Sequence, residues 1–199
     1  MSLIVATQNK GKLKEICRAL ADVGIEVEGM ASYPDLVPAV EDGTTFKENA
    51  QKKAQAIVRQ TGKPCLADDS GLTVAALHGR PGVYSARYAG EGATDSENNL
   101  LLLTEMAQVE DGQRQAAFCC VMALCYPNGE CLFFEGRLEG HILKKEQGDG
   151  GFGYDPLFQV DGDQRSLAQI SIDEKNSISH RGKALKQMIS NINNCSVLN

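Results

Sequence analysis

Two neighbouring carboxylates are the first residues in this sequence that could do chemistry. Asp68 and Asp69 follow the short apolar segment 65–67 and precede Ser70 and Gly71. Adjacent carboxylates repel each other unless a cation or a proton lies between them, and alternation along a strand points them in different directions. One of them can therefore face Mg²⁺, which prefers one or two carboxylates, several waters and phosphate oxygens. The other can take a proton from an attacking water, although an acidic turn with a capping residue explains the same pattern.

A second candidate site lies between a predicted strand and a predicted helix, and it consists of Thr7, Gln8, Asn9, Lys10, Gly11 and Lys12. Backbone N–H groups at a helix N-terminus, together with the positive end of the helix dipole, form a site for anions. Lys12 would add a positive charge, and Thr7 or Asn9 a hydrogen bond to phosphate oxygens. The segment is not a Walker A loop, because Leu13 stands where that loop requires Ser or Thr. A solvated basic helix start is the alternative.

A third group of polar residues surrounds the second predicted helix. Glu41 lies in an acidic turn just before this helix and is a candidate metal ligand. Asn49 and Lys53 are one helical turn apart and therefore share a helix face, where Lys53 could meet phosphate oxygens. Spacing alone favours the simpler interpretation, in which this lysine is solvated.

A glycine-rich segment in the second half of the chain offers a place for a planar base. Phe152 has a glycine on either side, which leaves its ring uncrowded, so a base could stack on it. Asp155 could accept a hydrogen bond from a base N–H. His180 and Arg181, with Lys175 shortly before them, stand at a predicted helix start, where acidic residues are preferred. These cations indicate a bound anion or an electron-rich oxygen. A core aromatic side chain and a surface basic pair are the structural alternatives.

The elements that must position these residues alternate between strands and helices. The residue patterns predict a strand over 3–6, a helix over 13–20, a helix over 45–61, a strand over 65–67 and a helix from 94. The last of these helices is expected to carry Leu100, Leu103 and Met106. A hairpin follows over 116–126 and 130–137, then a loop over 148–153 and a helix from about 180. This order predicts an α/β fold with a mixed sheet, and the chain length suits one domain or one domain with two lobes.

The composition narrows the class of protein. Hydrophobic residues make up 42% and charged residues 23% of the 199 residues, which is ordinary for a globular protein. A net charge of −6 argues against broad binding to nucleic acids. No segment approaches the ~20 apolar residues of a membrane span. The N-terminus lacks the basic start and cleavage site of a secretory signal, so we expect a cytoplasmic protein.

The seven cysteines form an odd-numbered set in a chain long enough to fold without disulfides. No CxxC pair is present, so neither a zinc site nor a dithiol site has its usual spacing. Cys119, Cys120 and Cys125 lie in an apolar run, where cysteine behaves as a small hydrophobe. We therefore expect reduced, structural thiols.

Several motifs, taken in their order, resemble one family closely: the non-canonical purine nucleoside triphosphate pyrophosphatases, also called inosine triphosphatases. The matching stretches are residues 6–12, 45–50, 67–72, 81–88, 150–156 and 179–182. Each stretch is weak by itself, but their joint order is specific, and together they span nearly the whole chain. Gln8 is a local departure, since the family commonly has a small residue such as Gly or Ser at this position.

The resemblance implies an elongated, two-lobed α/β fold with a central mixed β-sheet flanked by helices and an active-site cleft between the lobes. It also implies a homodimer and Mg²⁺-dependent hydrolysis of ITP, dITP and XTP to the nucleoside monophosphate and pyrophosphate. Such an activity would cleanse the nucleotide pool.

The same resemblance assigns roles to individual residues. Asp69 would be the general base and a metal ligand together with Glu41, and the paired carboxylates add Asp68 as a further candidate metal ligand. Residues 7–12 would hold the triphosphate with help from Lys53, and Ser70 would touch the substrate. The base and the nearby phosphate would be held by Phe152, Gly153, Tyr154, Asp155, Lys175, His180 and Arg181. Donors on His180 and Arg181 would suit a 6-keto purine and reject the 6-amino group of ATP.

Three other functions compete with this one. An aspartyl-phosphate phosphatase would use a nucleophilic carboxylate, but it requires a second acid two residues after the first, and Gly71 follows Asp69 at that distance. A septum-associated type of nucleotide pyrophosphatase would share the fold and the reaction but favour other nucleotides. A nucleotide-sensing module would bind the triphosphate without cleaving it, although binding a polyanion gains nothing from extra carboxylates.

Overall fold

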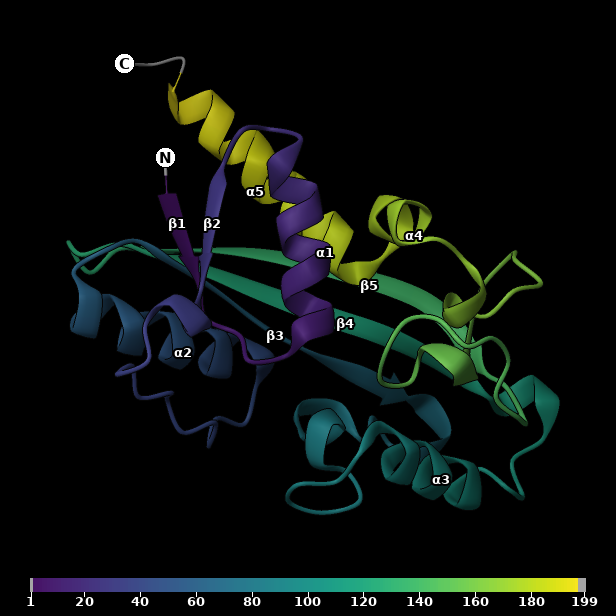
Figure 1. The fold of residues 1–199 in the computed structure, drawn as a ribbon. Coiled ribbons are helices and arrows are strands. Elements are labelled where there is room, and N and C mark those ends of the chain that lie inside the picture. The colour runs from purple at the N-terminus through teal and green to yellow at the C-terminus, as the bar shows by residue number, and fades with distance from the viewer. Residues whose placement is uncertain (1, 197–199) are drawn as a thin grey trace. The chain divides into compact units, whose positions relative to one another are not determined.

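The centre of the fold is one six-stranded mixed β-sheet, in a computed structural model that describes residues 2–196. The strand order is β2-β1-β3-β4-β5-β6, and β1 pairs in parallel with both β2 and β3, whereas β5 and β6 are antiparallel. The strands are β1 (Ser2–Val5), β2 (Glu26–Gly29), β3 (Cys65–Val74), β4 (Gln115–Cys125), β5 (Cys131–Ile142) and β6 (Phe158–Val160). The α/β fold with a mixed sheet is therefore confirmed (Figure 1).

The helices accompany the sheet along the chain. The α-helices are α1 (Lys10–Ala21), α2 (Phe46–Thr61), α3 (Asp95–Glu105), α4 (Ile172–Ile178) and α5 (His180–Ser196). Short 3₁₀ helices are η1 (Met30–Ser32), η2 (Ala75–Leu77), η3 (Gly82–Arg87), η4 (Asp111–Gln113), η5 (Asp155–Leu157) and η6 (Leu167–Gln169). Among residues 2–196, no helix is long and apolar enough to cross a membrane.

The chain forms two compact units that alternate along the sequence. The first unit contains residues up to Asp69, Cys120–Gly136 and the chain from Arg181 onward, and the second contains Ser70–Cys119 and Arg137–His180. Two of the four unit boundaries therefore fall inside motifs that carry candidate residues, one between Asp69 and Ser70 and the other between His180 and Arg181. The prediction of one domain with two lobes remains a prediction.

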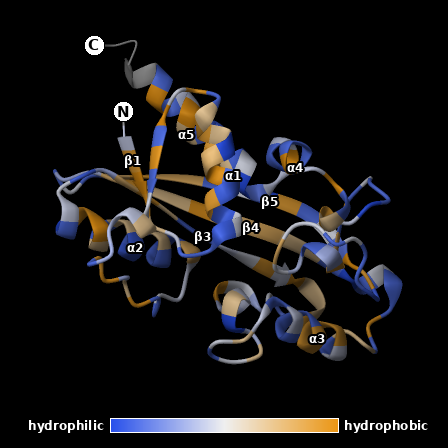
Figure 2. Ribbon diagram, in the orientation of Figure 1, coloured by the Kyte–Doolittle hydropathy of each residue, from blue (hydrophilic) through white to orange (hydrophobic). Residues whose placement is uncertain are grey.

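In the first unit, strand alternation separates two hydrophobic clusters. Leu3 and Val5 face a cluster that includes Ile16 and Leu20 of α1 and Leu185 of α5. Ile4 faces the other cluster, which is built on Ala50, Ala54 and Ile57 of α2. Helices α1 and α5 thus cover one face of β1 and α2 covers the other (Figure 1), and all three helices mix hydrophilic and hydrophobic residues along their length (Figure 2).

Local signals set the ends of α1 and α2. The Asn9 side chain caps α1 by accepting a hydrogen bond from the Lys12 N–H, at 3.0 Å. Thr45 caps α2 through the Glu48 N–H, and Gly62 ends that helix with a left-handed φ of 65°. The bounds of α2 agree with the predicted helix over 45–61, whereas α1 begins at Lys10, three residues before the predicted start at 13.

The core of the second unit gathers side chains from strands, α3 and the 3₁₀ segments. Leu72, Leu102, Met106, Phe118 and Phe158 are among its buried members.

The expected apolar side of α3 is partly wrong, because Leu100 is 65% exposed whereas Leu102 is fully buried. Two asparagines in the first half of α3, Asn98 and Asn99, are buried instead. The face of this helix therefore cannot be found from apolar spacing alone.

Strand β3 corrects the prediction of a short strand over 65–67. It runs without a break through both aspartates to Val74, and Leu72 and Val74 are fully buried. Gly71 permits this continuation, because a Cβ there would lie 2.4 Å from the Gly82 carbonyl oxygen and 2.4 Å from the Ser85 Oγ. The acidic pair therefore lies within a strand and not in a turn after one.

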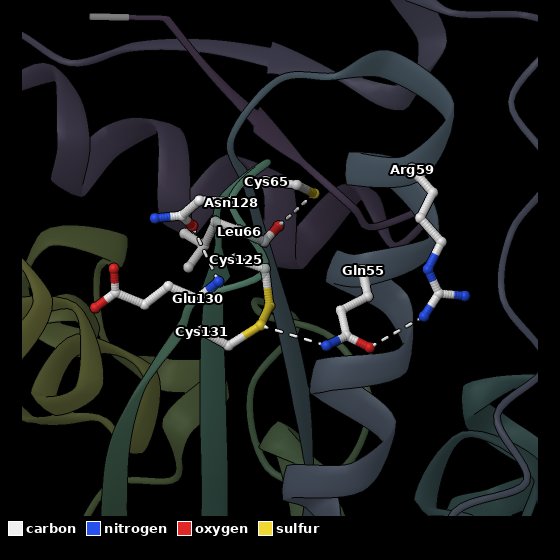
Figure 3. The surroundings of a disulfide bond; sticks show 8 residues. All are labelled: Gln55, Arg59, Cys65, Leu66, Cys125, Asn128, Glu130 and Cys131. Carbon is white, nitrogen blue, oxygen red and sulfur yellow. Dashed lines mark hydrogen bonds between the residues drawn. A yellow bond between two sulfur atoms is a disulfide. The ribbon is translucent and has the colours of Figure 1, made fainter.

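The cysteines also require a correction. Cys125 and Cys131 form a disulfide across the turn between β4 and β5, so they are not reduced thiols as expected (Figure 3). The Gln55 side chain of α2 contacts the Cys131 sulfur at 3.7 Å. The two cysteines are six positions apart in the sequence, so the hairpin itself brings them together. Cys17, Cys65, Cys119 and Cys120 are thiols, and the side chain of Cys195 lies outside the part of the chain that the structure describes.

Candidate functional site

The two aspartates of β3 serve two different sets of partners in the first unit. Both are almost completely buried, with 1% of Asp68 and 5% of Asp69 exposed. Asp68 contacts Lys12 and Arg181, whereas Asp69 contacts Lys53 and Asn49. Alternation along the strand was expected to separate the carboxylates in this way, and it does.

Asp68 is the centre of a buried ion network. Its Oδ1 lies 3.0 Å from the Lys12 Nζ, and its Oδ2 accepts a hydrogen bond from the Arg181 Nε at 2.9 Å. Arg181 also donates through Nη1 to Glu15 of α1, which is itself buried. Burial by itself would raise the pKa of Asp68, but the Arg181 guanidinium and the Lys12 ammonium outweigh it and hold that pKa well below its usual range. Asp68 therefore stays ionised and anchors the two cations.

Asp69 has an environment that suits a proton acceptor. The Lys53 Nζ lies 3.0 Å from its Oδ1, and the Asn49 Nδ2 donates to its Oδ2 at 3.2 Å. Burial raises the pKa of Asp69 above its usual value, against the opposite effect of Lys53 and Lys12. A carboxylate whose pKa is raised toward the working pH is a better general base than a surface aspartate.

Glu41 joins Asp69 through the same lysine. The Lys53 Nζ lies 3.0 Å from the Glu41 Oε2 as well as from Asp69. Burial alone would lower the pKa of Lys53. The negative charges of Asp69 and Glu41 outweigh burial and raise this pKa above its usual value, so the ammonium keeps its charge.

These contacts test whether the predicted metal ligands fit a metal. Within residues 2–196, no three His, Cys, Asp or Glu side chains form a metal-binding group, so the predicted set of Glu41, Asp69 and Asp68 is not assembled. Two of its members, Glu41 and Asp69, do share one cation, the Lys53 ammonium. Two carboxylates with waters and phosphate oxygens are a normal donor set for Mg²⁺. The pair therefore fits Mg²⁺, and Asp68 belongs to the ion network instead.

The segment 7–12 opens α1 beside this network. The Asn9 N–H bonds to the Thr7 Oγ1 at 3.2 Å, and Asn9 in turn caps the helix. Gln8, Asn9 and Lys10 are exposed, while Lys12 turns inward to Asp68. The helix start therefore combines N–H groups with one lysine, which is the arrangement that binds phosphate.

In the second unit, the ion pair of Asp155 and Lys175 holds the glycine-rich segment in place. Asp155 is buried and accepts a hydrogen bond from the Phe152 N–H at 2.9 Å, and its Oδ2 also pairs with the buried Lys175. The Lys175 Nζ lies 4.4 Å from the centre of the half-buried Phe152 ring. A Cβ at Gly151 would lie 2.2 Å from the Asp155 Oδ2, so only glycine fits there. These contacts fix the ring of Phe152.

Helix α3 and η3 hold the rest of this segment. Asp95 accepts a hydrogen bond from the Gly153 N–H at 2.7 Å, and the Asn99 Nδ2 donates to the Gly153 carbonyl at 3.2 Å. The Tyr154 ring belongs to the hydrophobic core, and its hydroxyl donates to the Ser85 carbonyl at 2.8 Å. The structure thus commits the Tyr154 side chain to packing.

The remaining predicted residues lie at the unit boundaries. His180 is 4% exposed, and its ring stacks on Phe118 with the centroids 4.8 Å apart. Ser70 is half-buried within β3. Arg181 is buried against Asp68 and Glu15, and its predicted contact with the base stays a prediction.

Two residues of the first-unit network were missed as site residues in the sequence. Glu15 carries no local signal except its place on the inner face of α1. Asn49 was noticed only for sharing a helix face with Lys53, and its contact with Asp69 was not expected. Buried polar residues on otherwise apolar helix faces would have been the signal, since such groups require partners.

This α/β fold places buried carboxylates beside lysines and the N-terminus of a helix. The model of the Ham1 family matches residues 3–191. The chain belongs to the Ham1 family, which confirms the family that the order of the motifs indicated.

Relatives agree over nearly the full length of the chain. A protein of Geobacter sulfurreducens called dITP/XTP pyrophosphatase is 51% identical over 183 residues, which are 92% of this chain and 92% of that protein. One of Desulforamulus reducens with the same name is 49% identical, over 97% of this chain and 96% of that protein. A solved HAM1 protein from Coxiella burnetii is 42% identical with a TM-score of 0.88, over 98% of this chain and 99% of that one.

Proposed function

We propose that this chain is a Mg²⁺-dependent dITP/XTP pyrophosphatase, which hydrolyses dITP, XTP and ITP to the nucleoside monophosphate and pyrophosphate. The observation that carries the proposal is the Asp69 carboxylate, buried and with a raised pKa, beside a second carboxylate, Glu41, and the lysine that they share. The names of the close relatives support the same activity.

Asp69 acts as the general base in this proposal. It takes a proton from water, which attacks the α-phosphorus and breaks the bond to the bridging oxygen, so that pyrophosphate leaves. Glu41 and Asp69 would hold Mg²⁺, which neutralises phosphate charge and positions the attacked group when bound. Lys12, Lys53 and the N–H groups at the start of α1 bind the phosphate oxygens.

The base is bound by the second-unit residues in this proposal. The Phe152 ring offers an apolar face for stacking, and Lys175 and Asp155 hold that ring in position. His180, Gly153 and Ser70 are the further substrate contacts that we propose. Discrimination against ATP comes from donors that suit a 6-keto oxygen and would be left unpaired by a 6-amino group.

The proposal extends to the surroundings of the enzyme. We expect a homodimer in the cytoplasm, where damaged purine nucleotides arise. Cleaving ITP, dITP and XTP there removes them before they can be used as precursors.

A single assay tests the proposal. Purified protein with Mg²⁺ is given dITP, XTP, ITP, GTP and ATP, and pyrophosphate is measured separately from orthophosphate. We expect pyrophosphate from the first three, no turnover after chelation of Mg²⁺, and a loss of about 10²- to 10⁴-fold in Asp69→Asn. Binding without cleavage would indicate a sensing module, and orthophosphate would indicate a phosphatase. A near-wild-type rate in Asp69→Asn would remove Asp69 from its role.

A further inference from the structure

Asn49 is the most completely buried polar residue beside the proposed base. It lies in the first turn of α2, and none of its surface is exposed. Its Nδ2 donates to the Asp69 Oδ2 at 3.2 Å, and its Oδ1 accepts from the Gly43 N–H at 2.8 Å. One side chain therefore ties the proposed base to the loop that follows Glu41.

The orientation of this amide is fixed by its partners. The backbone N–H of Gly43 is only a donor, so the Asn49 oxygen must face it and the amino group must face Asp69. A Cβ at Gly43 would lie 2.5 Å from the Asn49 Oδ1, so glycine allows this close approach. The donor to Asp69 is thus held in place by the loop.

Lys53 and Asn49 contact different oxygens of the Asp69 carboxylate. The lysine contacts Oδ1 and the asparagine contacts Oδ2, and the two side chains are one helical turn apart on α2. A carboxylate held at both oxygens cannot rotate. The hydrogen bond from Asn49 uses one lone pair of Oδ2 and leaves the other available for a proton from water.

We infer that Asn49 is a positioning residue that aims the Asp69 carboxylate at the attacking water. The inference rests on the proposed role of Asp69 as general base. Asn49 acts through Asp69 and through the Gly43 loop, and it has no substrate contact of its own. The charged groups that act on Asp69 are Lys53, Lys12 and Glu41, so Asn49 is a neutral partner of this carboxylate.

Two substitutions separate the hydrogen bond to Asp69 from the contact with the loop. Asn49→Ala removes both, and the isosteric Asn49→Asp keeps an acceptor for the Gly43 N–H but loses the donor to Asp69. We expect kcat for dITP to fall about 10- to 100-fold in both variants, with KM within about twofold of wild type. A wild-type kcat in Asn49→Asp would overturn the inference, because it would leave only the loop contact.

A matched control is available in the second unit. Asn98 of α3 is 3% exposed and, like Asn49, bridges two groups, although both are backbone: it accepts from the Ala89 N–H at 2.8 Å and donates to the Ala86 carbonyl at 3.3 Å. Asn98→Ala is expected to lower the thermal unfolding temperature as much as Asn49→Ala but to leave kcat unchanged. An equal loss of kcat in the two folded variants would assign Asn49 a structural role only.

A double-mutant cycle completes the test. In an Asp69→Asn background, Asn49→Ala should change the residual rate less than about twofold, because residues that act as a unit are not additive. The same factor in both backgrounds would overturn the inference. If Asp69→Asn itself keeps the wild-type rate, the proposed function of Asp69 fails instead, so the two failures are distinguishable.

Discussion

The ammonium of Lys53 lies 3.0 Å from the Oδ1 of Asp69, and the same nitrogen lies 3.0 Å from Glu41. A lysine thus occupies the position of the cation that two carboxylates share. If Glu41 and Asp69 hold Mg²⁺ as proposed, the metal would have to displace this ammonium, and Lys53 would then be available to phosphate oxygens. The lysine would prevent mutual repulsion of the carboxylates until substrate and metal arrive together.

Removal of the lysine charge should strengthen metal binding in the absence of nucleotide. Lys53→Met is expected to bind Mg²⁺ about tenfold more tightly than wild type, since a competing cation is gone. Turnover of dITP should fall, because a phosphate-binding charge is lost. Calorimetric titration with Mg²⁺ measures the affinity. Lys52→Met, which removes only an exposed pair with Asp42, should not change it, and an unchanged affinity in Lys53→Met would contradict the competition.

The buried pair of Arg181 and Glu15 should contribute measurably to stability. Glu15→Gln keeps the shape of the side chain but removes its charge, and we expect a loss of about 1–3 kcal/mol in the free energy of unfolding. Urea unfolding measures this loss. The pair of half-buried Arg87 and exposed Glu91 is the comparison, since the Glu91 side chain is 89% exposed and Glu91→Gln should have little effect. Equal effects in both variants would refute the importance of burial.

Stability should fall in acid because of Asp68. An unfolded aspartate has a pKa of about 3.9, and the folded pKa of Asp68 lies below this value. Its contribution is therefore fully present above about pH 5 and is lost as the pH falls through and below about 4. Asp68→Asn should lower the free energy of unfolding most at neutral pH, and the difference from wild type should shrink in acid. The exposed Asp35→Asn should show no such pH dependence.

The Phe152 ring should matter for substrate binding more than for folding. Stacking of a base on an aromatic ring contributes about 1–3 kcal/mol, so Phe152→Leu is expected to raise KM for dITP about tenfold or more. Phe133 is a matched control, since Lys47 lies 4.4 Å from its ring just as Lys175 lies 4.4 Å from Phe152. Steady-state kinetics of Phe133→Leu should give a wild-type KM. A wild-type KM for dITP in Phe152→Leu would argue against stacking of the base on this ring.

The fold was largely predictable from local signals. Helices α1, α2 and α5 follow from apolar spacing, and caps such as Thr45 and Gly62 mark their ends. Strand β3 was predicted too short, because aspartates followed by a glycine in its middle are typical of a turn. Only their buried partners show that the strand continues. The disulfide between Cys125 and Cys131 was excluded by chain length and odd cysteine number, although the hairpin between them favours it.

The candidate residues were found from their types, but their partners were not. Arg181 meets Glu15 and Asp68, which are 166 and 113 positions away in the sequence, and no local spacing reports such a contact. Tertiary pairing also directs Asp68 to Lys12 and Arg181, away from the two carboxylates that we propose for Mg²⁺. The division of work between the two aspartates therefore depends on which face of β3 each side chain occupies.

Gly71, the last residue of the acidic motif, imposes a constraint of a different kind. Its α-carbon lies so close to Gly82 and Ser85 that any side chain would have to push η3 away from β3. The side chains of the first three residues of the motif are therefore set by their chemistry, whereas the fourth must be glycine because no space is left for a Cβ atom. A larger residue at position 71 would therefore require a change in the backbone of η3 as well, even if it left the carboxylates unchanged.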